Sequence, residues 1–164
     1  MRTPLYTLVA LSALFTLPAY ANEPAATQSE FTTQAIQTKP FSGATLALTQ
    51  ARVVGQILNV EFIWTPPKKA EGGYQFKSTS SGSVKDFAYI DETTSKRITL
   101  LRDENGKYMT DPIAGTDGKS GKITINGSNP KVIALKFPAP PETSPTITID
   151  FPGAGSFYSV PVSR

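Results

Sequence analysis

Proline and glycine interrupt this chain so often that no long helix fits between them. The 164 residues include 14 prolines and 12 glycines, with short apolar runs between them. In the clearest run, residues 57–64, every second side chain is large and apolar. These side chains are Leu58, Val60, Phe62 and Trp64. A period of two is typical of a strand that buries one face, and Pro66-Pro67 ends the run because proline cannot donate to a sheet ladder.

Runs of this kind recur along the chain. We expect strands at residues 45–54, 57–64, 74–77, 86–91, 97–102, 107–110, 122–125, 132–137, 146–151 and 157–162. Asn105-Gly106 predicts a hairpin with a type I′ turn, in which both central residues take positive φ. The expected fold class is therefore all-β, an antiparallel immunoglobulin-like β-sandwich of about 7–9 strands.

The N-terminus has the pattern of an export signal. Arg2 precedes an apolar run at residues 5–17, and Ala19-Tyr20-Ala21 has the small-x-small pattern that signal peptidase accepts. We expect a signal peptide at 1–21, cleavage after Ala21, and a periplasmic or secreted protein.

The segment after the signal differs from the rest of the chain. Residues 22–43 are polar, rich in Thr, Gln, Ala and Pro, and lack a sustained period. They predict a flexible leader, followed by the β-sandwich domain at 44–164. No later stretch reaches the ~20 apolar residues that a membrane-spanning helix needs, so we expect no transmembrane segment.

The chain has no cysteine and no histidine. Disulfides, thiolate metal sites and serine–histidine triads are therefore excluded, and only carboxylate, lysine or tyrosine chemistry remains. We expect no enzyme activity, no catalytic residue, no cofactor and no metal site. The formal charge of +3 comes from scattered basic residues. Because nucleic-acid binders usually carry a basic stripe, no nucleic-acid partner is expected.

The C-terminal third combines several motifs in a fixed order. A Phe-Pro-Ala-Pro-Pro crossover at 137–141 is followed by a strand, a Pro152-Gly153 turn and a last strand ending in Val160-Pro161-Val162. With the hairpin at 102–108, this order resembles a family of exported bacterial proteins of no assigned activity. The resemblance covers residues 44–164 and implies an immunoglobulin-like β-sandwich of the cell envelope. Physically, the prolines hold the crossover extended.

Three aromatic residues are candidates for a ligand or partner surface. Tyr74 and Phe76 lie on a short run after two glycines, and Tyr108 follows the predicted hairpin. Trp64 shares the register of the buried face, so we assign it to the core. Solvent-facing aromatic rings are the usual platform for sugars or peptides, so a carbohydrate-binding module is one alternative function.

Two polar groupings allow other chemistry. Asp111, Asp117 and Asn126 surround the glycine-rich loop at 115–121, which has oxygen ligands for calcium but lacks the order of a calcium-binding loop. Whether this loop binds an ion stays open at the sequence level. Asp103 and Glu104 are among the carboxylates available to a hydrolase, with lysine as the remaining base. A carboxylate- or lysine-dependent hydrolase is therefore a second alternative.

The leading interpretation is a non-enzymatic binding module. An exported domain without the usual catalytic residue types points to an envelope accessory protein that contacts another envelope or secreted protein. Sheet edges or end loops would provide the contact, by strand addition or loop recognition. The sequence predicts neither the identity of this partner nor the oligomeric state.

Overall fold

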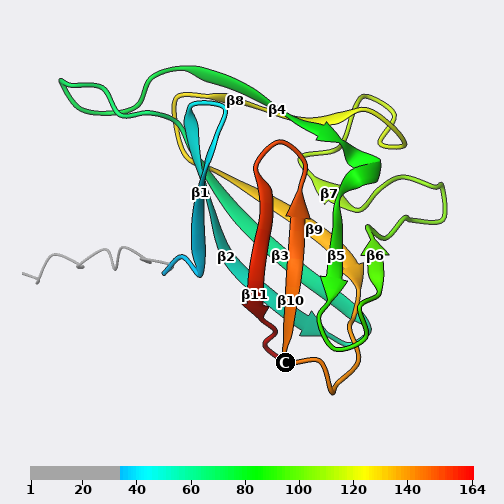
Figure 1. Ribbon diagram of the computed structural model, residues 1–164. Helices are drawn as coiled ribbons and strands as arrows, with labels where there is room; N and C mark the ends of the chain where they lie inside the picture. Colours follow the sequence, from blue (N-terminus) through cyan, green and yellow to red (C-terminus); the bar gives the residue numbers. More distant parts are fainter. Residues whose placement is uncertain (1–33) are drawn as a thin grey trace, which may run out of the picture. The chain divides into compact units, whose positions relative to one another are not determined.

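The computed structural model describes residues 34–164, in which strands connected by turns and loops make up most of the chain (Figure 1). Its strands are β1 Gln37–Phe41, β2 Ala44–Val54, β3 Ile57–Thr65, β4 Lys77–Ser83, β5 Ala88–Asp91, β6 Arg97–Thr99, β7 Thr110–Asp111, β8 Lys122–Gly127, β9 Lys131–Pro138, β10 Thr146–Phe151 and β11 Gly155–Pro161. A 3-10 turn, η1 Val84–Asp86, joins β4 to β5. The predicted signal peptide and residues 22–33 of the predicted leader lie outside the described residues. Within 34–164, no helix is long and apolar enough to cross a bilayer.

The strands form three antiparallel sheets. One has the order β1-β2-β3-β9-β7, a second the order β11-β10-β5-β6, and β4 pairs with β8 alone. The β4–β8 pair lies across one end of the two larger sheets (Figure 1). The predicted fold class, all-β and antiparallel, is confirmed and is consistent with a β-sandwich. The described residues contain eleven strands, more than the 7–9 expected, and two of them, β6 and β7, have only three and two residues.

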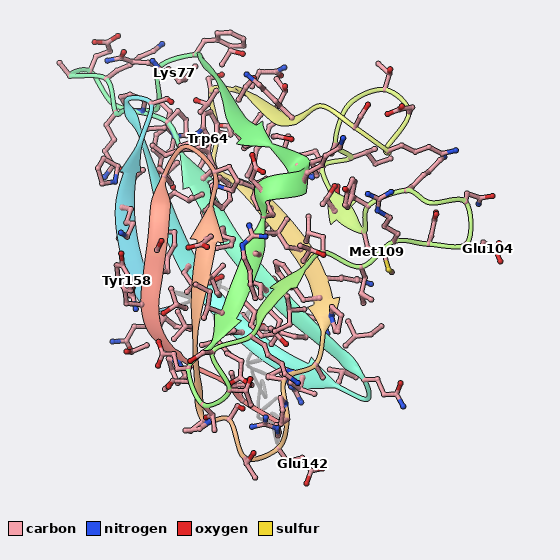
Figure 2. The ribbon with its side chains drawn as sticks, turned by 45° about the vertical axis from the view of Figure 1, so that its right-hand side comes forward. Trp64, Lys77, Glu104, Met109, Glu142 and Tyr158 are labelled. Atoms are coloured by element: carbon pink, nitrogen blue, oxygen red, sulfur yellow. The ribbon has the colours of Figure 1, made fainter. Side chains whose placement is uncertain are left out.

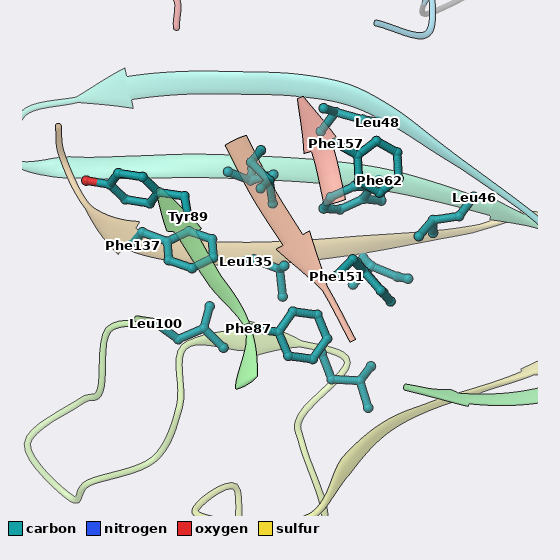
Figure 3. Close-up of a cluster of buried hydrophobic side chains, with 14 of the residues drawn as sticks. Leu46, Leu48, Phe62, Phe87, Tyr89, Leu100, Leu135, Phe137, Phe151 and Phe157 are labelled. Atoms are coloured by element: carbon teal, nitrogen blue, oxygen red, sulfur yellow. The ribbon is translucent and has the colours of Figure 1, made fainter. Parts of the chain in front are cut away.

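Aromatic rings from both larger sheets meet in the core. Phe62 on β3 packs edge-on against Phe151 of β10 at 5.1 Å and against Phe157 of β11 at 5.2 Å between ring centroids (Figure 3). Such edge-to-face pairs add to the stabilisation from burial. The predicted alternation in β3 is confirmed, because all four apolar residues of its inner face are 0% exposed. Trp64 is one of them, as expected.

The predicted boundary at residue 44 is wrong, because β1 precedes it. Residues Gln37–Phe41 pair with β2 in register from Gln37 opposite Leu48 to Phe41 opposite Ala44. Phe41 is 1% exposed, and its ring packs edge-on against Phe151 at 5.2 Å. Phe41, together with Ile36, which packs against the same core, anchors the polar segment to the sheet, so the end of the predicted leader belongs to the domain.

The hairpin at Asn105-Gly106 is confirmed, but its turn type is wrong. Gly106 has φ 75°, whereas Asn105 is not among the residues with positive φ. The Gly106 N–H donates to the Asp103 carbonyl at 2.9 Å. The Asp103 carboxylate also accepts from the backbone N–H groups of Asn105 at 2.9 Å and Lys107 at 2.8 Å. This side-chain turn fixes a different backbone path from the expected type I′ turn.

Contacts between the two larger sheets occupy both lateral edges of the sandwich. On one side, Gln37 of β1 donates to the Tyr158 carbonyl of β11, and the Val53 N–H donates to the Ser163 carbonyl at 2.8 Å. On the other side, the Leu101 N–H donates to the Lys136 carbonyl at 2.9 Å. Occupied edges protect a sheet against uncontrolled strand pairing.

We predict that Phe62→Ala destabilises the domain by about 3–5 kcal/mol, because the cavity removes contacts to both facing rings. The matched control is Phe76→Ala, which truncates a ring that is 71% exposed. It should change the free energy of unfolding by less than about 0.5 kcal/mol. Urea unfolding followed by fluorescence measures both values, and equal losses would contradict this assignment of the core.

Candidate functional site

A cleft of about 300 Å³ lies beside β7, at the edge of the five-stranded sheet. We call it the β7 cleft; it is lined by Asp103, Met109, Thr110, Asp111, Ala134 and Lys136. Backbone hydrogen bonds build it. The Met109 carbonyl accepts from the Lys136 N–H at 3.1 Å, and the Met109 N–H donates to the Leu101 carbonyl at 2.9 Å. These bonds hold the hairpin containing Asp103 alongside β9.

The β7 cleft combines an apolar floor with charged groups of both signs. Met109 and Ala134 contribute apolar surface, while two carboxylates and the Lys136 ammonium group are available to polar partners. Figure 2 shows Met109 at the base of the hairpin and Glu104 at its outer end. A cleft of this kind fits an apolar side chain with polar or charged neighbours.

Two exposed apolar side chains lie close to this cleft in the chain. Val132 is 57% exposed, and Ile113 is 61% exposed. Val132 is on the same face of β9 as Ala134 and Lys136, because side chains alternate along a strand. Ile113 follows β7 by two residues. We refer to Val132 and Ile113 as the apolar rim.

The three predicted surface aromatics do not form one surface. Phe76 is 71% exposed and Tyr74 is half-buried, both on the segment between β3 and β4. Tyr108, in contrast, is only 7% exposed, so its assignment to the surface is wrong. The Arg102 guanidinium group lies over the Tyr108 ring at 4.1 Å and also donates to its hydroxyl group. This stacking covers the ring and removes it from a binding platform.

Asp111 and Asp117 have different surroundings in the structure. Asp111 lines the β7 cleft, whereas the Asp117 carboxylate accepts from the N–H groups of Lys119 at 2.9 Å and Ser120 at 3.3 Å. Backbone hydrogen bonds, above all from Lys119, lower the pKa of Asp117. Within residues 34–164, no three acidic side chains group as potential metal ligands. The geometry offers no support for an ion between these two residues.

Two neighbouring carboxylates tie the turn after β5 to the rest of its sheet. Asp91 is 0% exposed and accepts from the Thr93 N–H at 3.1 Å and from the Thr94 hydroxyl group. Glu92 accepts from the hydroxyl groups of Thr146 at 2.6 Å and Thr148 at 2.7 Å. It also accepts from the Ser159 N–H at 2.9 Å. Sequence inspection does not reveal the role of Glu92, because its partners on β10 and β11 are distant in the chain, whereas the partners of Asp91 lie two and three residues away.

The pKa values of both carboxyl groups are lowered. Burial alone would raise the pKa of Asp91, but the hydrogen bonds from Thr94 and Thr93 outweigh it. The hydrogen bonds from Thr146 and Thr148 are the main causes that lower the pKa of Glu92. Both groups are therefore charged at neutral pH. Asp91 accepts within the turn after β5, whereas Glu92 joins this turn to β10 and β11.

No protein-family model matches this chain, and comparison with curated proteins and with solved structures finds no match. The resemblance to exported bacterial sandwich proteins therefore stays a prediction. The geometry of residues 34–164 alone carries the proposals below.

We predict that acid destabilises the domain through Asp91 and Glu92. Carboxyl groups with lowered pKa contribute stability above their unfolded pKa values, about 3.9 for Asp and 4.3 for Glu. That contribution is lost as the pH falls through the lower folded values. Urea unfolding between about pH 7 and pH 2 should show this loss.

The variant Glu92→Gln tests the cause. It should be less stable than the wild type by about 1 kcal/mol at neutral pH, and it should lose less stability on acidification. Glu104→Gln, at the exposed end of the hairpin, is the matched control and should keep the wild-type pH dependence. Identical acid profiles for Glu92→Gln and the wild type would remove Glu92 from this role.

Proposed function

We propose that this protein is an exported, non-enzymatic envelope accessory or binding module that contacts another envelope or secreted protein. The observation that carries this proposal is the β7 cleft with its apolar rim. Protein interfaces combine a desolvated apolar centre with a polar margin, and a few buried apolar side chains supply most of the affinity. Ile113 and Val132 supply the apolar part, and Asp103, Asp111 and Lys136 supply the charged margin.

The proposed contact uses side chains and loops rather than strand addition. Strand addition needs a free row of backbone N–H and C=O groups at a sheet edge. The contacts at Gln37, Ser163 and Leu101 occupy some of these backbone groups, including the carbonyls of Tyr158 and Lys136. This favours loop recognition over strand addition as the mode of binding.

Export to the periplasm or the medium is part of the same proposal. The signal pattern at 1–21 supports it. We expect the mature protein from the native host to begin at Asn22, and N-terminal mass spectrometry of the envelope and medium fractions measures this. An intact Met1 in the mature protein, or a purely cytoplasmic location, would contradict export.

A carboxylate- or lysine-dependent hydrolase is the second candidate. The observation that favours a hydrolase is that Asp103, Asp111 and Lys136 line the same cleft. A hydrolase would lose turnover in Asp103→Asn or Asp111→Asn, whereas a binding module shows no turnover to lose. A carbohydrate-binding module is the remaining alternative; Tyr74→Ala on a glycan array separates it from protein binding.

We predict that Val132→Glu reduces partner capture from an envelope extract at least tenfold. A charge placed in an apolar contact costs more than the ~1.4 kcal/mol that this factor represents. The measurement is pull-down followed by quantitative mass spectrometry.

Val54→Glu is the matched control, because Val54 is 60% exposed and Val132 is 57% exposed. The two valines pair with Ile57 and Ile63, at opposite ends of β3. Val54→Glu should retain the partner. Equal capture by both variants would exclude the apolar rim as the contact.

A further inference from the structure

The segment between β3 and β4 leaves an aromatic ring in solvent beside several lysines. We call residues 66–77 the basic arm. Phe76 is 71% exposed, more than any other large apolar side chain of the described residues. Lys68 and Lys69 are also exposed, and Lys77 is half-buried. Figure 2 shows Lys77 at the end of the domain where β4 begins.

Backbone hydrogen bonds fix the shape of the basic arm. The Lys69 N–H donates to the Gly73 carbonyl at 3.0 Å, and the Gln75 N–H donates to the Pro67 carbonyl at 2.8 Å. Lys68 and Tyr74 form an antiparallel bridge. Gly73, with φ 72°, permits the reversal between them. The chain therefore presents Phe76 outward in a defined structure.

The turns beside the arm make this end of the domain basic. Trp64 pairs with Lys131, and Lys77 pairs with Gly127, so the β8–β9 turn emerges next to the arm. Across residues 66–77 and 127–131 there are four lysines and one acidic residue, Glu71. The local charge is therefore +3, from four positive groups and one negative group.

We propose that the basic arm docks on the anionic face of a phospholipid bilayer. Lysines near an anionic membrane each contribute about 1 kcal/mol of attraction, and an aromatic ring is favourable at the headgroup level. Phe76 supplies the ring, while Lys68, Lys69 and Lys77 supply the charge. The arm shares no residue with the β7 cleft or the apolar rim, so different variants test the membrane contact and the proposed protein contact.

Vesicle co-sedimentation of the processed chain tests this proposal. The vesicles are phosphatidylcholine alone or phosphatidylcholine with about 30 mol % phosphatidylglycerol, at about 50 and 500 mM salt. The chain should sediment with the anionic vesicles at low salt, and high salt should release it. Lys68→Glu combined with Lys69→Glu should weaken binding at least about thirtyfold, because two attractive charges are lost. Phe76→Ser should weaken it about tenfold, since the ring no longer inserts.

Matched controls separate the arm from net charge and from exposed rings in general. Lys119→Glu combined with Lys122→Glu makes the same charge change outside the arm, and Tyr158→Ser removes a ring that is 64% exposed. Tyr158→Ser should bind the vesicles like the wild type. The double lysine control variant should show only the small loss of binding that its lower net charge causes. Thermal unfolding checks that each variant is folded.

Three results would overturn the proposal. The first is equal binding to neutral and anionic vesicles, and the second is an equal loss in the control and arm variants. The third is binding that Phe76→Ser leaves unchanged while a soluble polyanion such as heparin competes fully, because it would show attraction to anions without membrane insertion. A negative result in the vesicle experiments does not change the result expected from the capture experiment with Val132→Glu.

Discussion

The packing of Phe62 against Phe151 and Phe157 is the contact on which the rest of the structure depends. It joins β3 of one sheet to β10 and β11 of the other, in a chain without cysteine. Many small domains use disulfides for this purpose. Here burial of aromatic and aliphatic side chains replaces them. The interior side chains therefore serve packing alone. The groups that can bind a partner lie at the sheet edges and at the ends of the domain.

The edges of the sandwich determine what the surface can do. Hydrogen bonds through Gln37, Ser163 and Leu101 occupy backbone groups that a partner strand would need. The same type of contact, at Lys136 and Met109, opens the β7 cleft between a hairpin and β9. The backbone hydrogen bonds that occupy this sheet edge thus also form the concave surface that we assign to a protein partner. The basic arm lies outside these closures and carries a different chemistry.

The sequence predicts best where burial follows a simple period. The alternation in β3 predicts both the strand and the buried position of Trp64. In contrast, β4 is missed beyond Lys77, because its Ser- and Thr-rich sequence has no apolar period. Burial there involves polar side chains, and the Ser81 hydroxyl accepts from the Ile123 N–H at 3.0 Å. Similarly, β1 is missed because only two apolar side chains, Ile36 and Phe41, anchor this polar segment and they show no strand period.

The candidate sites depend even more on contacts between distant residues. Phe76 is predicted at the surface and lies there. Tyr108 is covered by the Arg102 side chain, and the spacing of residues in the sequence does not predict this contact. The β7 cleft is not predictable at all, since Asp103 and Lys136 meet only through backbone bonds between separate segments.

Site-specific photo-crosslinking in the native host tests the central claim most directly, namely that the apolar rim is a specific protein contact. A photoreactive phenylalanine analogue replaces Val132 in one strain and Val54 in another, and mass spectrometry identifies the adducts. The account predicts one discrete protein adduct at position 132 and none at position 54. The same adducts at both positions, or no protein adduct at position 132, would contradict it.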